Sequence, residues 1–127
     1  MSSIRAQGTA PEERMHEVLR SILGKRRRID RNYRELPGTP DFFVPSLELA
    51  VFVHGCFWHC CPAHGQVPAS NKSYWQPKLE ANKRRDQRVR RKLNRLGLRV
   101  WRVWEHDLGR KRMDSTASRL AVRLEEL

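Results

Sequence analysis

The segment LELAVFVHG, residues 47–55, is the clearest indication of fold class in the chain. Its apolar run has the length of a strand and is rich in β-branched side chains. A continuous apolar run predicts a central strand covered on both faces, because a half-exposed strand would alternate apolar and polar residues. Two further strands are predicted, LRVWRVW at residues 98–104 and the short segment FFV at residues 42–44.

Helical patterns flank these strands. TAPEERMHEVLRSILG, residues 9–24, places its apolar side chains on one face at helical spacing. A second helix is predicted to begin between residues 73 and 77 and to end at Leu96, and SRLAVRLEEL, residues 118–127, predicts a short closing helix. The order α, β, β, α, β, α predicts one α/β domain, residues 1–127, in which helices flank a mixed sheet.

The chain has 127 residues, a formal net charge of +12 and an isoelectric point of about 10.8. This charge favours a polyanionic partner, with nucleic acid first. A membrane surface is the weaker alternative, because no apolar run approaches the roughly 20 residues of a membrane span. The N-terminal MSSIRAQGTAPEE lacks the apolar core of a secretory signal, so we expect a cytoplasmic protein. The whole chain has three cysteines, and this odd number favours free thiols or metal ligands over a set of disulfides.

The segment between the central strand and the second helix has the composition of a loop and holds candidate zinc ligands. Cys56, Cys61 and His64 follow the spacing C-x4-C-x2-H. Three such ligands can wrap one tetrahedral ion, and His106, which follows the last strand, is a candidate fourth ligand. The alternative is a set of buried free cysteines with solvated histidines. Cys60 is spare in this scheme, or it replaces Cys61 as a ligand.

The predicted second helix carries polar side chains where its buried stripe runs. The stripe follows steps of four and three through Trp75, Leu79, Asn82, Asp86, Val89, Leu93 and Leu96. Two interpretations are open for Asn82 and Asp86. In the first, they lie at a solvated end of the stripe or make one structural hydrogen bond; in the second, this half of the helix faces a polar site. The opposite face is basic, with Lys83, Arg84, Arg85, Arg88, Arg90, Arg91, Lys92 and Arg95. That face is either simply solvated or attracts phosphates, with Arg85 as a candidate DNA contact.

The motif PGTPDFFV places Asp41 directly before an apolar strand. Asp41 closes a turn, the commoner role of a lone Asp, or it binds a cation. The central strand ends at Val53 and His54, so an Asp, a backbone carbonyl and a His in this region can hold Mg²⁺ beside a phosphate. His59 would then be a nearby general base, and Asp86 would accept a hydrogen bond from its other ring nitrogen.

Aromatic side chains lie among the candidate ligands. Phe57 and Trp58 stand between Cys56 and His59, and Trp75 stands near the start of the second helix. These rings either belong to the core or form apolar wedges, because a loop held by a metal can present rings that unstack base pairs. Composition favours the core for at least one of them.

The motifs LPGTPDFFV, VFVHGCFWH, VPASNKSYW, ANKRRD and LRVWRVWEH, in this order, resemble the very-short-patch-repair (Vsr) DNA mismatch endonucleases. The resemblance covers about residues 1–108. It implies a restriction-endonuclease-like fold, catalytic Mg²⁺, structural Zn²⁺ and a place at the bacterial nucleoid. The implied activity nicks one strand 5′ to the thymine of a T·G mismatch, which arises when 5-methylcytosine deaminates. Double-stranded DNA is the implied partner, with mismatch-repair proteins and a cytosine-5 methyltransferase as functional partners.

The resemblance also implies roles for active-site residues. Asp41 matches the metal-binding Asp of the family, and the Val53 backbone carbonyl joins the metal shell. His54 matches the active-site His near the scissile phosphate. His59 matches the general base and Asp86 its hydrogen-bonded partner.

Further positions match residues around that site. Glu12 matches an N-terminal acidic residue near the active site, and it also completes a capping box with Thr9. Asn82 matches an active-site neighbour. The remaining matches are the aromatic residues at the mismatch (Phe57, Trp58 and Trp75) and the zinc set (Cys56, Cys61, His64 and His106). The stretch CCPAHG replaces the His-rich run of the family, and His106 stands where some members have Cys.

The leading hypothesis is therefore a Mg²⁺-dependent, mismatch-directed DNA nicking endonuclease, acting as a monomer because one nick needs one active site. One alternative is a zinc-stabilised DNA-binding module without catalysis. The set Asp41, His54, His59 and Asp86 argues against it, because binding alone needs none of these residues. The other alternative is a restriction or homing-type nuclease of the same fold, which would not need a mismatch wedge.

Overall fold

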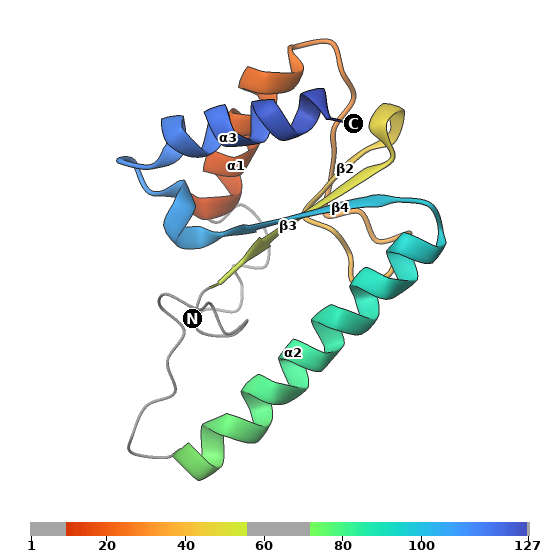
Figure 1. The fold of residues 1–127 in the computed structure, drawn as a ribbon, viewed down its shortest axis with the longest axis vertical. Helices are drawn as coiled ribbons and strands as arrows, with labels where there is room; N and C mark the ends of the chain where they lie inside the picture. The colour runs from red at the N-terminus through yellow and green to blue at the C-terminus, as the bar shows by residue number, and fades with distance from the viewer. Residues whose placement is uncertain (1–9, 56–71, 127) are drawn as a thin grey trace.

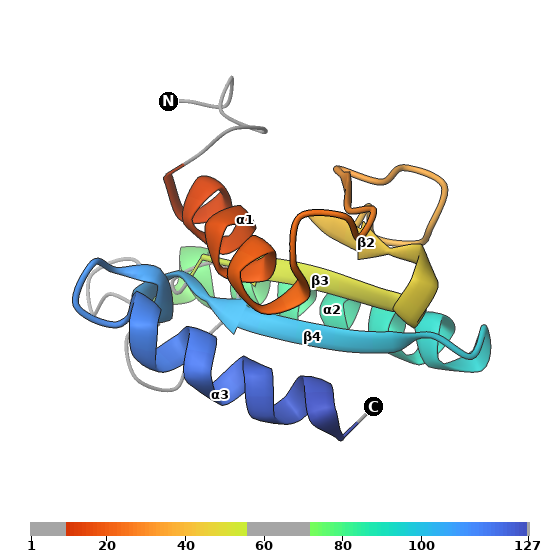
Figure 2. The same ribbon diagram turned by 90° about the horizontal axis from the view of Figure 1, so that it is seen from above.

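The computed structural model describes residues 10–55 and 72–126. Its centre is a four-stranded sheet in the order β1-β2-β3-β4, formed by Asp30–Arg31, Phe42–Val44, Leu49–His54 and Arg99–Trp104. Three α-helices surround it: α1 (Ala10–Leu23), α2 (Lys72–Arg95) and α3 (Met113–Glu125). Helices α1 and α3 cover one face and α2 lies on the other (Figures 1 and 2). This arrangement confirms the predicted mixed α/β sheet flanked by helices.

Strand β3 is the central strand that the apolar run predicted. It pairs with β2 antiparallel, with Phe42 opposite Val51, and with β4 parallel, with His54 opposite Trp104. Leu49, Ala50 and Val51 are completely buried. A parallel pair needs a long crossover connection, and the chain between β3 and β4 contains α2. The ends of β3 and β4 therefore lie at the same edge of the sheet.

The hydrophobic core lies between the sheet and the layer formed by α1 and α3. It comprises Met15, Val18, Leu19, Phe42, Val44, Leu49, Val51, Trp101, Val103, Leu108 and Leu120. The period of two along β3 and β4 sends alternate side chains to this core. Phe52, His54, Arg102 and Trp104 consequently face the α2 side, where His54 is buried, Phe52 and Trp104 are half-buried and Arg102 is exposed. The N-terminal end of α2 extends away from the sheet (Figure 1).

Several predicted boundaries were wrong. Helix α2 begins at Lys72, one residue before the predicted range, because Pro77 is accommodated inside the helix rather than in its first turn. Helix α3 begins at Met113 rather than at residue 118. A 3₁₀ turn, η2 (Pro45–Leu47), precedes β3, which begins at Leu49.

Leu96, predicted as the last residue of the buried stripe, is exposed. It lies outside α2, because the helix ends at Arg95 and the chain turns at Gly97 with a positive φ of 81°. Within the described residues, no helix has the length and apolar character needed to cross a lipid bilayer.

Candidate active site

A pocket of about 300 Å³ opens where α2 crosses the sheet. Its walls come from the turn before β2, from β3, from β4 and from α2. The lining residues are Gly38, Thr39, Asp41, Phe52, Val53, His54, Arg85, Asp86, Val89, Arg90, Val100 and Arg102. The structure therefore brings together four residues that the sequence analysis selected for the catalytic site, namely Asp41, Val53, His54 and Asp86.

Asp41 stands at the point where the ladder between β2 and β3 ends. The last backbone pair joins Phe42 and Val51, and beyond it the Val53 N–H donates to Asp41 Oδ2 at 2.7 Å. The carboxylate thus replaces a backbone acceptor. The backbone carbonyl of Asp41 accepts a hydrogen bond from the Asn32 N–H at 2.9 Å, so the residue is held from both sides.

This hydrogen bond also defines the direction of the Val53 carbonyl. In an extended strand, the N–H and C=O of one residue point to the same side. Because the Val53 N–H points to Asp41, the Val53 carbonyl oxygen faces the same side of β3. A carboxylate and a backbone carbonyl therefore lie on one side of the strand, which is the composition of a site for a hard cation.

His54 is the last residue of β3 and is only 7% exposed. Its ring meets two aromatic neighbours edge-on, Phe52 with centroids 6.0 Å apart and Trp104 with centroids 5.6 Å apart. Two neighbouring rings restrict the orientation of the imidazole. The side chain is held on the α2 face beside the pocket.

Helix α2 supplies the acidic residue of the opposite wall. Asp86 is half-buried and lines the pocket, as do Val89 and Arg90 on the following turn. Asn82, one turn earlier, is half-buried and accepts a hydrogen bond from Arg85 Nη1 at 3.1 Å. The polar interruption of the stripe therefore coincides with the pocket at Asp86, whereas Asn82 is not among the lining residues.

Two other candidate residues lie elsewhere. Glu12 is 3% exposed in the first turn of α1, which packs on the opposite face of the sheet, and it is not among the lining residues. Its proposed capping partner, Thr9, is outside the described residues. Trp75 lies near the start of α2, where its ring meets that of Tyr74 edge-on with centroids 5.0 Å apart. The structure therefore gathers neither side chain into the pocket.

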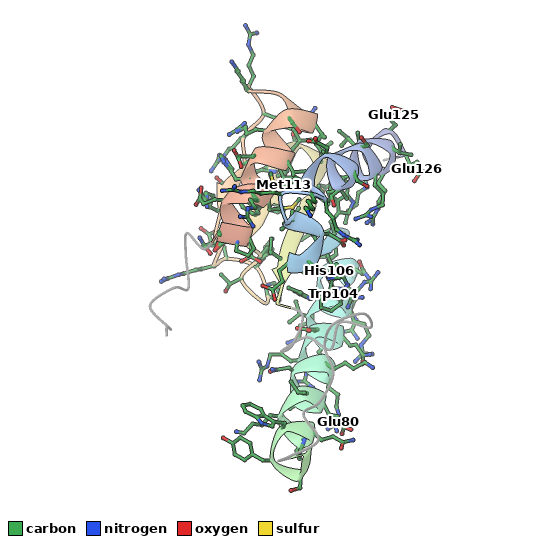
Figure 3. All side chains as sticks on the ribbon, turned by 90° about the vertical axis from the view of Figure 1, so that its left-hand side faces the viewer. Glu80, Trp104, His106, Met113, Glu125 and Glu126 are labelled. Carbon is green, nitrogen blue, oxygen red and sulfur yellow. The ribbon has the colours of Figure 1, made fainter. Side chains whose placement is uncertain are left out.

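Six candidates fall in the segment 56–71, outside the described residues: Cys56, Phe57, Trp58, His59, Cys61 and His64. Of the predicted zinc set only His106 is described. It lies in the 3₁₀ turn η3 (Glu105–Leu108), next to Trp104 (Figure 3), with its Nε2 3.4 Å from Asp107 Oδ1. Residues 10–55 and 72–126 contain no group of three or more metal-ligating side chains, so the zinc prediction stays a prediction.

Sequence reasoning missed part of the pocket. Arg102 had no assigned role, although alternation along the strand places it on the same face as Trp104 and in register with Phe52. Arg90 was assigned to the basic outer face of the helix, yet it lines the pocket one turn after Asp86. Gly38 contributes a close approach to α2 that no sequence pattern indicated. The pocket holds three arginines against two aspartates, which favours an anionic ligand.

Comparison with known proteins agrees with this chemistry. The family described as DNA mismatch endonuclease Vsr matches residues 1–64. The chain belongs to the Vsr family. It is 47% identical over 109 residues to the type II nicking enzyme V.XorIIP of Xanthomonas oryzae pv. oryzae, covering 85% of this chain and 78% of that protein.

Two further relatives widen the comparison. The type II nicking enzyme V.NaeI of Lentzea aerocolonigenes is 44% identical over 110 residues, which cover 84% of this chain and 66% of that protein. The DNA mismatch endonuclease Vsr of Escherichia coli K12 is 38% identical over 128 residues, covering 99% of this chain and 79% of that protein. The resemblance stated from the motifs is therefore confirmed, and the chain is a member of a family of DNA endonucleases.

Proposed function

We propose that this Vsr-family protein is a Mg²⁺-dependent endonuclease that nicks one DNA strand 5′ to the thymine of a T·G mismatch. One observation carries the proposal: a single pocket gathers Asp41 from the turn before β2, Val53 and His54 from β3, and Asp86 from α2. Arginines line the same pocket, and the chain has a net charge of +12, which favours a phosphate backbone as the ligand.

The described oxygen atoms suit Mg²⁺. Asp41 offers a carboxylate and Val53 a backbone carbonyl on the same side of β3, and Mg²⁺ commonly uses few protein oxygens beside water and phosphate oxygens. When bound there, the ion would polarise the scissile phosphate and stabilise the charge of the leaving oxygen. The hydrogen bond from the Val53 N–H orients the carboxylate before any ligand arrives. Asp41 thus starts in a defined position, which lowers the entropic cost of assembling the site.

The histidines take the proton-transfer and phosphate-contact roles in this proposal. His54, restrained by Phe52 and Trp104, contacts the scissile phosphate. His59, outside the described residues, accepts a proton from the attacking water. Asp86 accepts a hydrogen bond from the other ring nitrogen of His59 and so fixes its tautomer. The half-buried position of Asp86 in the pocket wall supports this role.

The remaining sequence hypotheses concern DNA distortion and the loop. We propose that Phe57 and Trp58 insert beside the mismatch, assisted by Trp75, and that Asn82 and Arg85 contact the DNA. We also propose that Cys56, Cys61, His64 and His106 bind structural Zn²⁺. The chemistry of this donor set is that of a closed tetrahedral site. The end of β3 and η3 lie close together, since a Cβ on Gly55 would be 3.9 Å from Glu105 Oε1.

A nicking assay on matched duplexes tests the proposal. The purified chain is incubated with a T·G duplex and with a T·A duplex of otherwise identical sequence, each with Mg²⁺ or with EDTA. We expect one nick 5′ to the mismatched thymine, in the T·G duplex only and with Mg²⁺ only. Equal cleavage of both duplexes would instead support a restriction or homing-type nuclease, and binding without cleavage would support a DNA-binding module. Repeating the assay over several sequence contexts identifies the preferred flanking bases.

A further inference from the structure

Two arginines that have no role in the proposed function approach the pocket from opposite walls. Arg90 lies on α2, one turn after Asp86, and Arg102 lies on β4, opposite Phe52 in the parallel register. Both residues are exposed. Within residues 10–55 and 72–126, neither guanidinium has a carboxylate partner, although Asp41 and Asp86 line the same pocket.

Arg102 is held in place by an aromatic ring. Its guanidinium carbon lies 5.2 Å from the centroid of the Trp104 ring, and that ring meets the His54 ring 5.6 Å away. A stacked guanidinium keeps the N–H donors along its edge available for a further ligand. Arg102 and His54 therefore share one aromatic support, and a ligand of Arg102 would lie near a ligand of His54.

The surroundings favour a phosphate as that ligand. The other cation in the pocket, Arg85, already donates a hydrogen bond to Asn82, whereas Arg90 and Arg102 lie on facing walls. An arginine on an edge strand also protects the strand from pairing with another chain. Protection of the strand edge could account for Arg102, but it does not apply to Arg90, which lines the pocket from a helix. Guanidinium groups recognise phosphate oxygens through paired N–H donors.

We propose that Arg90 and Arg102 together bind one backbone phosphate of the DNA strand that is cut, adjacent to the scissile phosphate. The inference rests on the proposed function, since it assigns a second phosphate position beside the same site. Binding from both walls fixes the register of the strand in the pocket. The phosphate beside His54 then enters the site in one orientation.

A protein–DNA double-mutant cycle tests this site. Single uncharged methylphosphonate linkages are placed in turn along the cleaved strand of a T·G duplex, and binding is measured by fluorescence anisotropy without Mg²⁺. On unmodified DNA, R90Q and R102Q should each lower the affinity for the duplex about tenfold, because each removes one charge-assisted contact to a phosphate. On DNA with one particular neutral linkage, both substitutions should change affinity less than twofold.

The matched control is R88Q, which removes an exposed arginine of α2 that is not among the lining residues. Its effect should be the same whether or not that linkage is neutral. R102K keeps the charge but loses the fork geometry, so it should recover part of the affinity. Circular dichroism shows whether each variant folds. If R102Q does not fold, R90Q still supplies the test, because Arg90 occupies an exposed position on α2.

The proposal is overturned if no neutral linkage removes the penalty of R90Q or R102Q, or if the two arginines respond to different linkages. Failure of the proposed function looks different. If the wild-type chain binds the duplex but does not nick it, while both arginines respond to the same linkage, the phosphate site stands and the nicking activity does not. If it nicks the duplex without this coupling, only the phosphate site is rejected.

Discussion

The contact between Gly38 and α2 gives a prediction whose size follows from the structure. Gly38 has a φ of 78°, and a Cβ built on it would lie 2.5 Å from Val89 Cγ1 and 3.2 Å from Val89 Cγ2. Val89 cannot simply rotate away, because a β-branched side chain in a helix has one strongly preferred rotamer. Gly38→Ala therefore combines backbone strain with a steric clash that forces α2 and the turn apart.

The two contributions can be separated with Gly97→Ala. Gly97 also has a positive φ, 81°, but no atom lies within 4 Å of its Cβ position. Gly97→Ala should cost about 1 kcal/mol of unfolding free energy from strain alone. Gly38→Ala should cost about 2–4 kcal/mol, because overpacking typically adds about 1–3 kcal/mol. For a domain of this size, 1 kcal/mol corresponds to a Tm change of about 4 °C, so the two variants should differ clearly.

Thermal unfolding followed by circular dichroism measures both variants, together with Val89→Ala and the double variant Gly38→Ala/Val89→Ala. Removing the Val89 methyl groups creates room for the new Cβ. The double variant should therefore be more stable than the sum of the single changes predicts, by about 1 kcal/mol or more. Equal Tm losses for Gly38→Ala and Gly97→Ala, or additive effects in the double variant, would refute the proposed clash.

Three further predictions concern the site and its surroundings. Asp41→Ala and His59→Ala should each abolish nicking of a T·G duplex without changing the zinc content measured by mass spectrometry; wild-type turnover in either variant contradicts its assigned role. His106→Ala should lower the zinc content below one ion per chain and reduce Tm, whereas an unchanged metal content removes His106 from the zinc set. Burial, assisted by Arg31 and Arg20, lowers the pKa of His16 below its ordinary 6.5, so its imidazole NMR signal should titrate below pH 6.5. The unfolded chain binds this proton more readily than the folded chain does. The free energy of unfolding should therefore fall as the pH drops from 6.5 through the folded pKa of His16. In a urea-unfolding series, His16→Gln should weaken this fall.

Most of the secondary-structure elements and much of the site chemistry could be predicted from the amino-acid sequence alone. The apolar run before His54 predicted a central strand, because only a strand covered on both faces tolerates such a run. The polar interruption at Asp86 pointed to a site on α2, since a buried stripe does not carry a carboxylate without a partner. The motifs around Asp41 and His54 identified the family, which the comparisons confirm. The predicted boundaries of α2 and α3 were wrong, because end positions depend on local packing and on how a proline is accommodated.

Which distant residues share the pocket became visible only in the folded chain. The parallel register of β3 and β4 places Trp104 directly opposite His54 and Arg102 diagonally from it, two residues earlier on β4. No local pattern encodes this register. The crossing of α2 over the sheet turns Arg90 into the pocket and brings Val89 against Gly38, so three residues that no sequence pattern had assigned to the site become part of it. The physical reason is that periodicity reports which face a side chain occupies within its own element, whereas pairing between strands and packing between layers determine what it meets there.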